Sequence, residues 1–287
     1  MPISAVLYLM PMENVRIRPT MGHHAHAAFL SLLQLGNPER AEQLHAQSDQ
    51  KPFTVSPLIG NSRLEDGWLR FQAGTACHIR ITFLQDDLFA DLGRVFYSNA
   101  QQEIRLGSAI FRLDRLISSP SEKWSNHQSY QDLLNSAASE AEIHLKFYSP
   151  TAFRPMESHP QVKAESNTTS TILDLVRCFR SWVRKWNAFA PQSIDKSQLL
   201  SAVEQNLRLT QINGRLRQLD FGNFKENGFV GDCTFEIANS DQIRWINLLT
   251  DFAFYAGTGY KATMGMGQTR RLNGRNNHKP KQPSNSI

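Results

Sequence analysis

Apolar and polar residues alternate without a break from Cys77 to Phe83, and this short segment constrains the fold more than any other. Cys77, Ile79, Ile81 and Phe83 fall on one side of an extended chain, and the residues between them are polar. Side chains of a strand point alternately to opposite faces, so the pattern predicts a β-strand. The apolar run over residues 5–9 predicts a second strand near the start of the chain.

Helical patterns separate these strands. Apolar residues recur at helical spacing from Ala25 to Leu33, which predicts a helix with one apolar stripe. Asn37 followed by Pro38 is typical of a helix N-cap with proline in the first turn. The further elements predicted in this half are a short helix from Pro38 to Leu44, a helix over residues 86–96 and a strand over residues 104–113.

The second half of the chain repeats this order of elements. Alternating Ile143, Leu145 and Phe147 predict a strand, and residues 172–190 carry an apolar stripe that predicts an amphipathic helix. Trp182 lies in this helix, and we expect it and Trp186 to pack in the core. The remaining predicted elements are strands over residues 207–209, 216–221 and 229–237 and a helix over residues 243–255.

Two passes of β-α-β-β-α-β predict an α+β fold of two tandem ferredoxin-like (RRM-like) domains with antiparallel sheets. We place the N-terminal domain at residues 1–139 and the C-terminal domain at residues 140–272. Residues 118–139 predict an inserted loop with a short helix. Residues 273–287 contain no apolar residue except the last, and predict a disordered basic tail.

Charge is distributed unevenly along the chain. Residues 1–150 carry 13 Lys and Arg against 15 Asp and Glu, a balance of −2, and the remainder carries 18 against 11, a balance of +7. A basic half is consistent with a polyanionic partner or with a surface that only maintains solubility.

Cys77, Cys178 and Cys233 are far apart and form no CxxC motif, so we expect buried thiols rather than a metal site. The apolar run from Ile3 to Met10 is too short to span a membrane, and we expect a cytoplasmic protein.

The most specific segment is a glycine-rich loop, defined here as residues 257–267, which follows the predicted apolar helix. Four glycines in eleven residues allow close approach of the backbone to a ligand or to another part of the chain. From residue 256 to residue 287 the chain has six Lys and Arg and no acidic residue. Such a loop suits a phosphate backbone, and the alternative is a glycine-rich turn without a ligand.

This loop, with the pattern G-x-G-x-x-x-T-x-G-x-G, resembles the signature of the RAMP superfamily of CRISPR proteins. More narrowly, the chain resembles the CRISPR-associated endoribonucleases that cut the repeat transcript into guide RNAs. The segments over residues 22–30, 44–58 and 228–237 are similar to the first helix, the active-site segment and the second-domain hairpin of that family. The resemblance spans nearly the whole chain in the right order.

The resemblance implies an endoribonuclease that needs no metal ion. In that reaction the 2′-hydroxyl of the substrate attacks the adjacent phosphate, which leaves a 2′,3′-cyclic phosphate and a 5′-hydroxyl. Histidine suits the proton transfers because its reference pKa of about 6.5 lies near the working pH. His45 matches the general acid/base position, and Lys51 matches the cation that stabilises charge on the phosphate.

A third catalytic role stays open, because Phe29, Leu30 and Ser31 stand where some members of the family have a tyrosine. The candidates for that role are His23, His24, His26 and Arg18.

The expected RNA-binding residues are Gly257, Gly259, Lys261, Gly265, Gly267, Arg270, Arg271 and Arg18. We expect CRISPR repeat RNA and guide RNA as partners, with other effector subunits as further candidates, and no cofactor, metal or membrane. The alternative function is a non-catalytic RNA-binding subunit of an effector complex.

Overall fold

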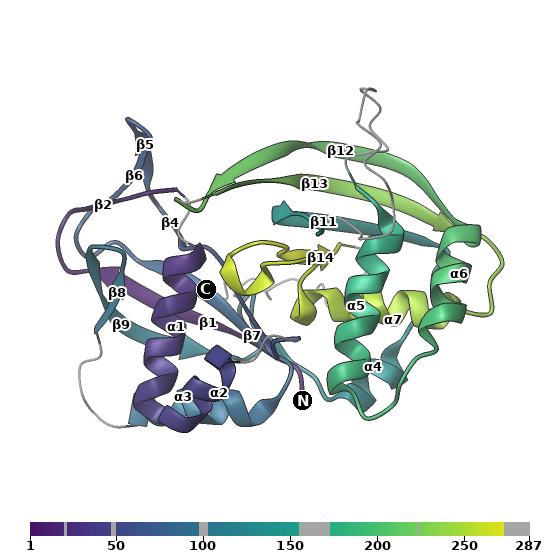
Figure 1. Ribbon diagram of the computed structural model, residues 1–287, viewed down its shortest axis with the longest axis horizontal. Helices are drawn as coiled ribbons and strands as arrows, with labels where there is room; N and C mark the ends of the chain where they lie inside the picture. Colours follow the sequence, from purple (N-terminus) through teal and green to yellow (C-terminus); the bar gives the residue numbers. More distant parts are fainter. Residues whose placement is uncertain (20–21, 47–49, 98–102, 155–172, 223, 273–287) are drawn as a thin grey trace, which may run out of the picture. The chain divides into compact units, whose positions relative to one another are not determined.

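A computed structural model describes residues 1–19, 22–46, 50–97, 103–154, 173–222 and 224–272 (Figure 1). These residues form two compact units. Unit 1 comprises Met1–Asp132 together with the short segment Thr263–Gly265, and unit 2 comprises Leu133–Ala262 and Met266–Leu272. The predicted tail, residues 273–287, lies outside the described residues. The boundary expected at residue 139 stays a prediction.

The main sheet of unit 1 is antiparallel, with the order β3-β7-β1-β9-β8, and β10 and β4 extend it beside β1 and β7. A separate small sheet has the order β2-β6-β5. The strands of the main sheet are β1 (Ile3–Pro11), β3 (Phe53–Val55), β4 (Ile59–Gly60), β7 (Cys77–Phe83), β8 (Glu103–Leu106), β9 (Ala109–Ile117) and β10 (Asn126–His127). Those of the small sheet are β2 (Val15–Ile17), β5 (Arg63–Glu65) and β6 (Trp68–Phe71), and the helices of the unit are α1 (Gly22–Gly36), α2 (Pro38–Ala46) and α3 (Asp86–Tyr97).

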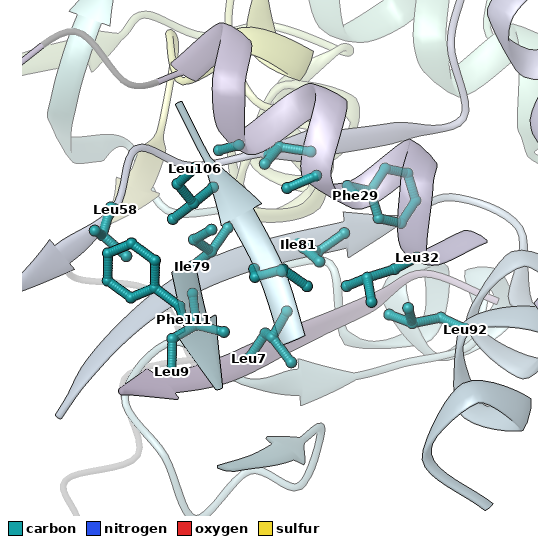
Figure 2. Packing of buried hydrophobic residues seen from close by; sticks show 14 of the residues in the cluster. Leu7, Leu9, Phe29, Leu32, Leu58, Ile79, Ile81, Leu92, Leu106 and Phe111 are labelled. Carbon is teal, nitrogen blue, oxygen red and sulfur yellow. The ribbon is translucent and has the colours of Figure 1, made fainter. Parts of the chain in front are cut away.

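The core of unit 1 lies between the main sheet and these helices, as Figure 2 shows for Ile79 and Ile81 of β7 and Phe29 of α1. The strand predicted from the alternation at residues 77–83 is confirmed. Its polar side is buried as well, because Arg80 is only 2% exposed. Its Nε donates to Ser4 Oγ at 2.8 Å, which satisfies part of the hydrogen-bonding capacity of the buried guanidinium.

Unit 2 contains β11 (Glu142–Thr151), β12 (Leu207–Asp220), β13 (Lys225–Ile237) and β14 (Thr269–Arg271), paired antiparallel in the order β12-β13-β11-β14. Its helices are α5 (Leu175–Phe189), α6 (Lys196–Asn206) and α7 (Ile243–Ala256), with α4 (Tyr130–Ser136) at its start. The chain therefore passes through strand, helices, two strands, helix and strand. The strand that comes first along the chain lies between the third and the fourth. This is the ferredoxin-like arrangement, and the predicted α+β fold with antiparallel sheets is confirmed.

Three details differ from the sequence prediction. The strand expected over residues 104–113 is a hairpin, because Gly107 adopts a positive φ of 65° and turns the chain between β8 and β9. The strands expected at 207–209 and 216–221 are one continuous strand, β12. Neither α6 nor the small sheet was predicted. For the sheet the reason is that strands of three or four residues carry little periodicity.

Other expectations about the core are confirmed. Trp182 and Trp186 are 0% exposed, and the ring NH of Trp182 donates to Thr258 Oγ1 at 3.0 Å. The three cysteines are buried free thiols, and burial raises the pKa of Cys77 to about 12. The inserted segment at 118–139 contains the short helix α4. In the part of the chain that the structure describes, no helix is long and apolar enough to span a bilayer.

Candidate active site and glycine-rich loop

The N-terminus of α1 packs directly against Thr263–Gly265, the segment of the glycine-rich loop that belongs to unit 1. A Cβ at Gly22 would lie 1.8 Å from the carbonyl oxygen of Met264, so the backbones meet where a side chain would stand. Gly265 has a positive φ of 88° and donates its N–H to Val55 O at 2.9 Å. Both positions therefore require glycine, and they fix the segment beside the first turn of α1.

This packing places the carbonyl of Thr263 against the ring of His26 in α1. The distance from His26 Nδ1 to Thr263 O is 3.1 Å. A carbonyl oxygen can only accept a hydrogen bond, so Nδ1 carries the proton and Nε2 of the neutral ring carries the lone pair. The ring also stacks on Phe53, with centroids 5.7 Å apart and an interplanar angle of 17°.

Burial and nearby positive charges lower the pKa of His26 and so favour its neutral form. Burial is the largest influence and lowers the pKa of His26, and the positive charge of Lys51 lowers it further. The hydrogen bond to Thr263 acts in the opposite direction, and His45 contributes a smaller lowering effect. His26 stacks on Phe53, two residues after Lys51, and Lys51 donates to the carbonyl of Leu44, next to His45, so the three residues share one neighbourhood.

His45 and Lys51 come from the end of α2 and the chain that follows it. Asn37 caps the helix as predicted, because its Oδ1 accepts the N–H of Arg40 at 3.1 Å. His45 is exposed in the last turn, one residue after the buried Leu44. The ammonium of Lys51 donates to Leu44 O, which leaves donors for another ligand, and burial lowers the pKa of Lys51.

The other candidates for the third role occupy different surroundings. The rings of His23 and His24 lie with centroids 3.9 Å apart, and burial lowers the pKa of both. The ring of His24 is next to Gly107, at the turn between β8 and β9. The guanidinium of Arg18 lies over Trp68 of the small sheet, 5.4 Å from the ring centroid. Of the four candidates, His26 is therefore the one whose pKa the charges of Lys51 and His45 lower.

In unit 2, the glycines of the loop allow the chain to approach itself. Gly257, Gly259 and Gly267 have positive φ values of 63°, 77° and 68°. A Cβ at Gly259 would lie 2.2 Å from Ala152 O, and one at Gly267 would lie 2.0 Å from Thr258 O. Their N–H groups donate within the unit, for example from Gly267 to Pro150 O at 2.9 Å and from Gly259 to Ser181 Oγ at 3.0 Å. The glycines thus shape the loop, and their contact with RNA stays a prediction.

Lys261 of the loop lies among aromatic rings near the turn between β12 and β13. Its Nζ is 3.3 Å from the ring centroid of Phe224 and 4.6 Å from that of Phe221. Glu226 Oε2 lies 4.0 Å from the same atom. Burial lowers the pKa of Lys261, whereas Glu226 raises it. Cation–π contact and the carboxylate hold the ammonium in this cluster, and the Lys261 side chain as a whole is 18% exposed.

Arg270 and Arg271 in β14 are 7% and 3% exposed. The guanidinium of Arg271 lies 2.8 Å from Glu140 Oε2 and 3.5 Å from Asp251 Oδ2, so it connects β14 with α7 and with the segment that precedes β11. Burial lowers the pKa of Arg270, whose guanidinium faces the ring of Phe254. Contact of either arginine with phosphate stays a prediction, and the geometry gives Arg271 a structural role in unit 2.

We expect Arg271→Ala to destabilise unit 2 more than it weakens RNA binding. The change removes one member of a buried ion cluster and leaves Asp251 without that partner, which costs about 3–5 kcal/mol. Denaturant unfolding measures the loss, and Arg208→Ala, an exposed arginine of β12, serves as the control. A folded variant with unchanged stability and a large loss of RNA affinity would instead place Arg271 on phosphate.

Comparison with known proteins assigns most of the chain to family models. Residues 1–135 match the CRISPR Cas6 N-terminal domain, and residues 145–269 match the CRISPR-associated endoribonuclease Cas6. A comparison with curated proteins finds no match.

Solved structures of similar fold cover nearly the full length. A Cas6 product complex is 26% identical, with a TM-score of 0.74 over 95% of this chain and 99% of that chain. Thermus thermophilus Cas6 is 25% identical, with a TM-score of 0.68 over 95% and 98%. The product of a Cas6-related gene from Pyrococcus furiosus, 10% identical with a TM-score of 0.63 over 95% and 99%, shows the fold alone. The two family matches and the shared double ferredoxin-like fold show that this chain belongs to the Cas6 family of CRISPR-associated endoribonucleases.

Proposed function

We propose that this protein cleaves CRISPR repeat RNA without a metal ion, by attack of the substrate's 2′-hydroxyl on the adjacent phosphate. The products are a 2′,3′-cyclic phosphate and a 5′-hydroxyl. The observation that carries the proposal is the shared neighbourhood of His26, His45 and Lys51, in which Lys51 donates to the carbonyl beside His45 and the ring of His26 stacks on Phe53, two residues after Lys51. The charges of Lys51 and His45 also lower the pKa of His26. Two proton-transfer groups and one cation are the set that this reaction needs.

His26 acts as the general base. Its proton is on Nδ1, which donates a hydrogen bond to Thr263 O, so the lone pair of Nε2 can take the proton of the 2′-hydroxyl. A base must be unprotonated before the reaction, and the lowered pKa of His26 favours that state at neutral pH. Thr263 supports the base in the way that an orienting carbonyl or carboxylate supports other catalytic histidines.

His45 acts as the general acid, and Lys51 stabilises the charge that develops on the phosphate. His45 is exposed at the end of α2, so it can reach the leaving 5′-oxygen of a bound RNA. Lys51 is held by Leu44 O, the carbonyl next to His45, which restricts the position of its ammonium. When the P–O bond to the leaving oxygen breaks, the proton of His45 passes to that oxygen, while His26 keeps the proton of the 2′-hydroxyl.

Substitution of the two histidines tests this division of roles. We expect His26→Ala and His45→Ala each to lower the single-turnover cleavage rate by about 10²–10⁴-fold while the affinity for repeat RNA changes little. Lys51→Ala should slow cleavage too, and EDTA should leave wild-type activity intact. His24→Ala is the matched control, since His24 lies in the same helix but beside Gly107.

Three results would contradict these assignments. Full activity in His26→Ala, combined with its loss in His24→Ala, would move the third role to the other histidine. Loss of wild-type cleavage in EDTA, with recovery on adding a divalent cation, would exclude the metal-free reaction. Wild-type protein that binds its repeat RNA tightly and never cuts it would favour the non-catalytic subunit.

The dependence of cleavage on pH tests the electrostatic coupling. Since burial and Lys51 lower the pKa of His26, the base stays neutral below the ordinary histidine pKa of about 6.5, and the acidic limb of the rate profile should lie below that value. Lys51→Gln removes one of the lowering charges, so its acidic limb should move to higher pH. Lys123→Gln, an exposed cation of the same unit, is the control and should leave the limb in place. An acidic limb that does not move in Lys51→Gln would show that the two groups are not coupled.

A further inference from the structure

The small sheet β2-β6-β5 of unit 1 places three arginines side by side on one face. Arg16 of β2 is directly opposite Arg70 of β6, and Arg70 is directly opposite Arg63 of β5. All three side chains are exposed. Four of the thirteen basic residues in the first 150 positions lie on this sheet or directly after β2, although that half of the chain has a balance of −2. Positive charge is therefore concentrated at the small sheet.

Such a row destabilises the sheet, because like charges on directly opposed residues repel. Arg70 is compensated by Glu65, at 2.9 Å, and by Asp66, at 3.8 Å. Among the described residues, Arg16 and Arg63 have no salt-bridge partner within 4.0 Å. An anion supplied by a ligand would remove the remaining repulsion.

Trp68 lies on the same face, two residues from Arg70 along β6. The guanidinium groups of Arg16 and Arg18 each lie 5.4 Å from the centroid of its ring, which is partly exposed. The opposite face of the sheet is fixed in the core, since Ile17 and Phe71 are 3% and 1% exposed. The sheet thus cannot turn over, and it presents its arginines and its tryptophan to solvent.

We propose that this face binds an unpaired segment of the RNA substrate, with Arg16, Arg18 and Arg63 on phosphates and Trp68 stacked against a base. The inference rests on the proposed function for the identity of the ligand. Guanidinium groups pair with phosphate oxygens in a bidentate manner, and an aromatic ring stacks on a base of any sequence. An acidic protein segment would satisfy the arginines but would make no comparable use of the indole ring. RNA therefore fits the complete face better.

Binding of repeat RNA that carries a 2′-deoxy nucleotide at the cleavage position tests the proposal without cleavage. For Arg16→Gln/Arg63→Gln, the slope of log K against log salt should fall by about 1.4, because each lost phosphate contact on single-stranded RNA accounts for about 0.7. Trp68→Leu should weaken binding by about 5- to 100-fold through the lost stacking, with little change in the slope. For both variants, the cleavage rate of unmodified repeat RNA at saturating protein should stay at the wild-type value.

Arg105→Gln/Arg112→Gln is the matched control, since it removes the same charge from β8 and β9 of the same unit. If the slope of log K against log salt fell equally in this control, the effect would come from long-range attraction rather than from contacts at the small sheet, and the proposal would be overturned. Wild-type affinity and slope in Arg16→Gln/Arg63→Gln and in Trp68→Leu would overturn it as well. Loss of binding to a polyglutamate peptide with RNA binding intact would assign the face to an acidic protein segment.

These outcomes differ from a failure of the proposed function. In that case the wild-type protein would neither bind nor cleave repeat RNA, and the RNA ligand of the small sheet would be refuted together with the nuclease. A failure confined to the small sheet leaves wild-type cleavage and binding intact and shows only in the variants. The two readouts, affinity and rate at saturation, therefore separate the two proposals.

Discussion

The close approach of two backbones at Gly22 is the constraint on which the candidate active site depends. The first turn of α1 and the carbonyl of Met264 lie so near that a Cβ at position 22 would be 1.8 Å from the oxygen. This contact sets where Thr263 lies, and Thr263 O accepts the hydrogen bond that His26 Nδ1–H donates. The glycines of the loop are thus part of the support of a catalytic group, in addition to any contact they make with RNA. A loop far along the sequence thereby sets the protonation pattern of a histidine in the first helix.

Electrostatics joins this histidine to the two residues that the family resemblance identifies. His26, His45 and Lys51 come from α1, from the end of α2 and from the segment before β3, and the last two lower the pKa of the first. Partial burial strengthens these interactions because the local dielectric is lower than in water. Burial also distinguishes Arg271 from Lys261 in unit 2. Arg271 is almost fully buried and is paired with Glu140 and Asp251, whereas the side chain of Lys261 stays partly exposed.

Much of the fold could be predicted from the sequence, because the signals that specify these elements lie within short segments of the chain. The alternation around Ile79, the apolar stripe of α5 that includes Trp182 and the cap at Asn37 each act within a few residues, and the structure confirms all three. The turn at Gly107 was not predicted, because apolar residues continue on both sides of it and one glycine does not distinguish a turn from a strand interior.

The candidate site was less predictable because its contacts join distant residues. Nothing within α1 distinguishes His26 from His23 and His24, since the partner that sets His26 apart, Thr263, is 237 residues away. Likewise the acidic partners of Arg271 come from positions 140 and 251, so its burial could not be read from the basic stretch that follows α7.

The tautomer of His26 tests the central claim most directly, because the claim is that the glycine-rich loop prepares this ring as a base. Nitrogen NMR of the histidine rings in the RNA-free protein at neutral pH, assigned by comparison with His26→Gln, reports which nitrogen carries the proton. The account predicts a neutral ring with the proton on Nδ1 and the lone pair on Nε2. A proton on Nε2 would leave no acceptor facing the substrate, and would contradict both the contact with Thr263 and the role of His26 as the general base.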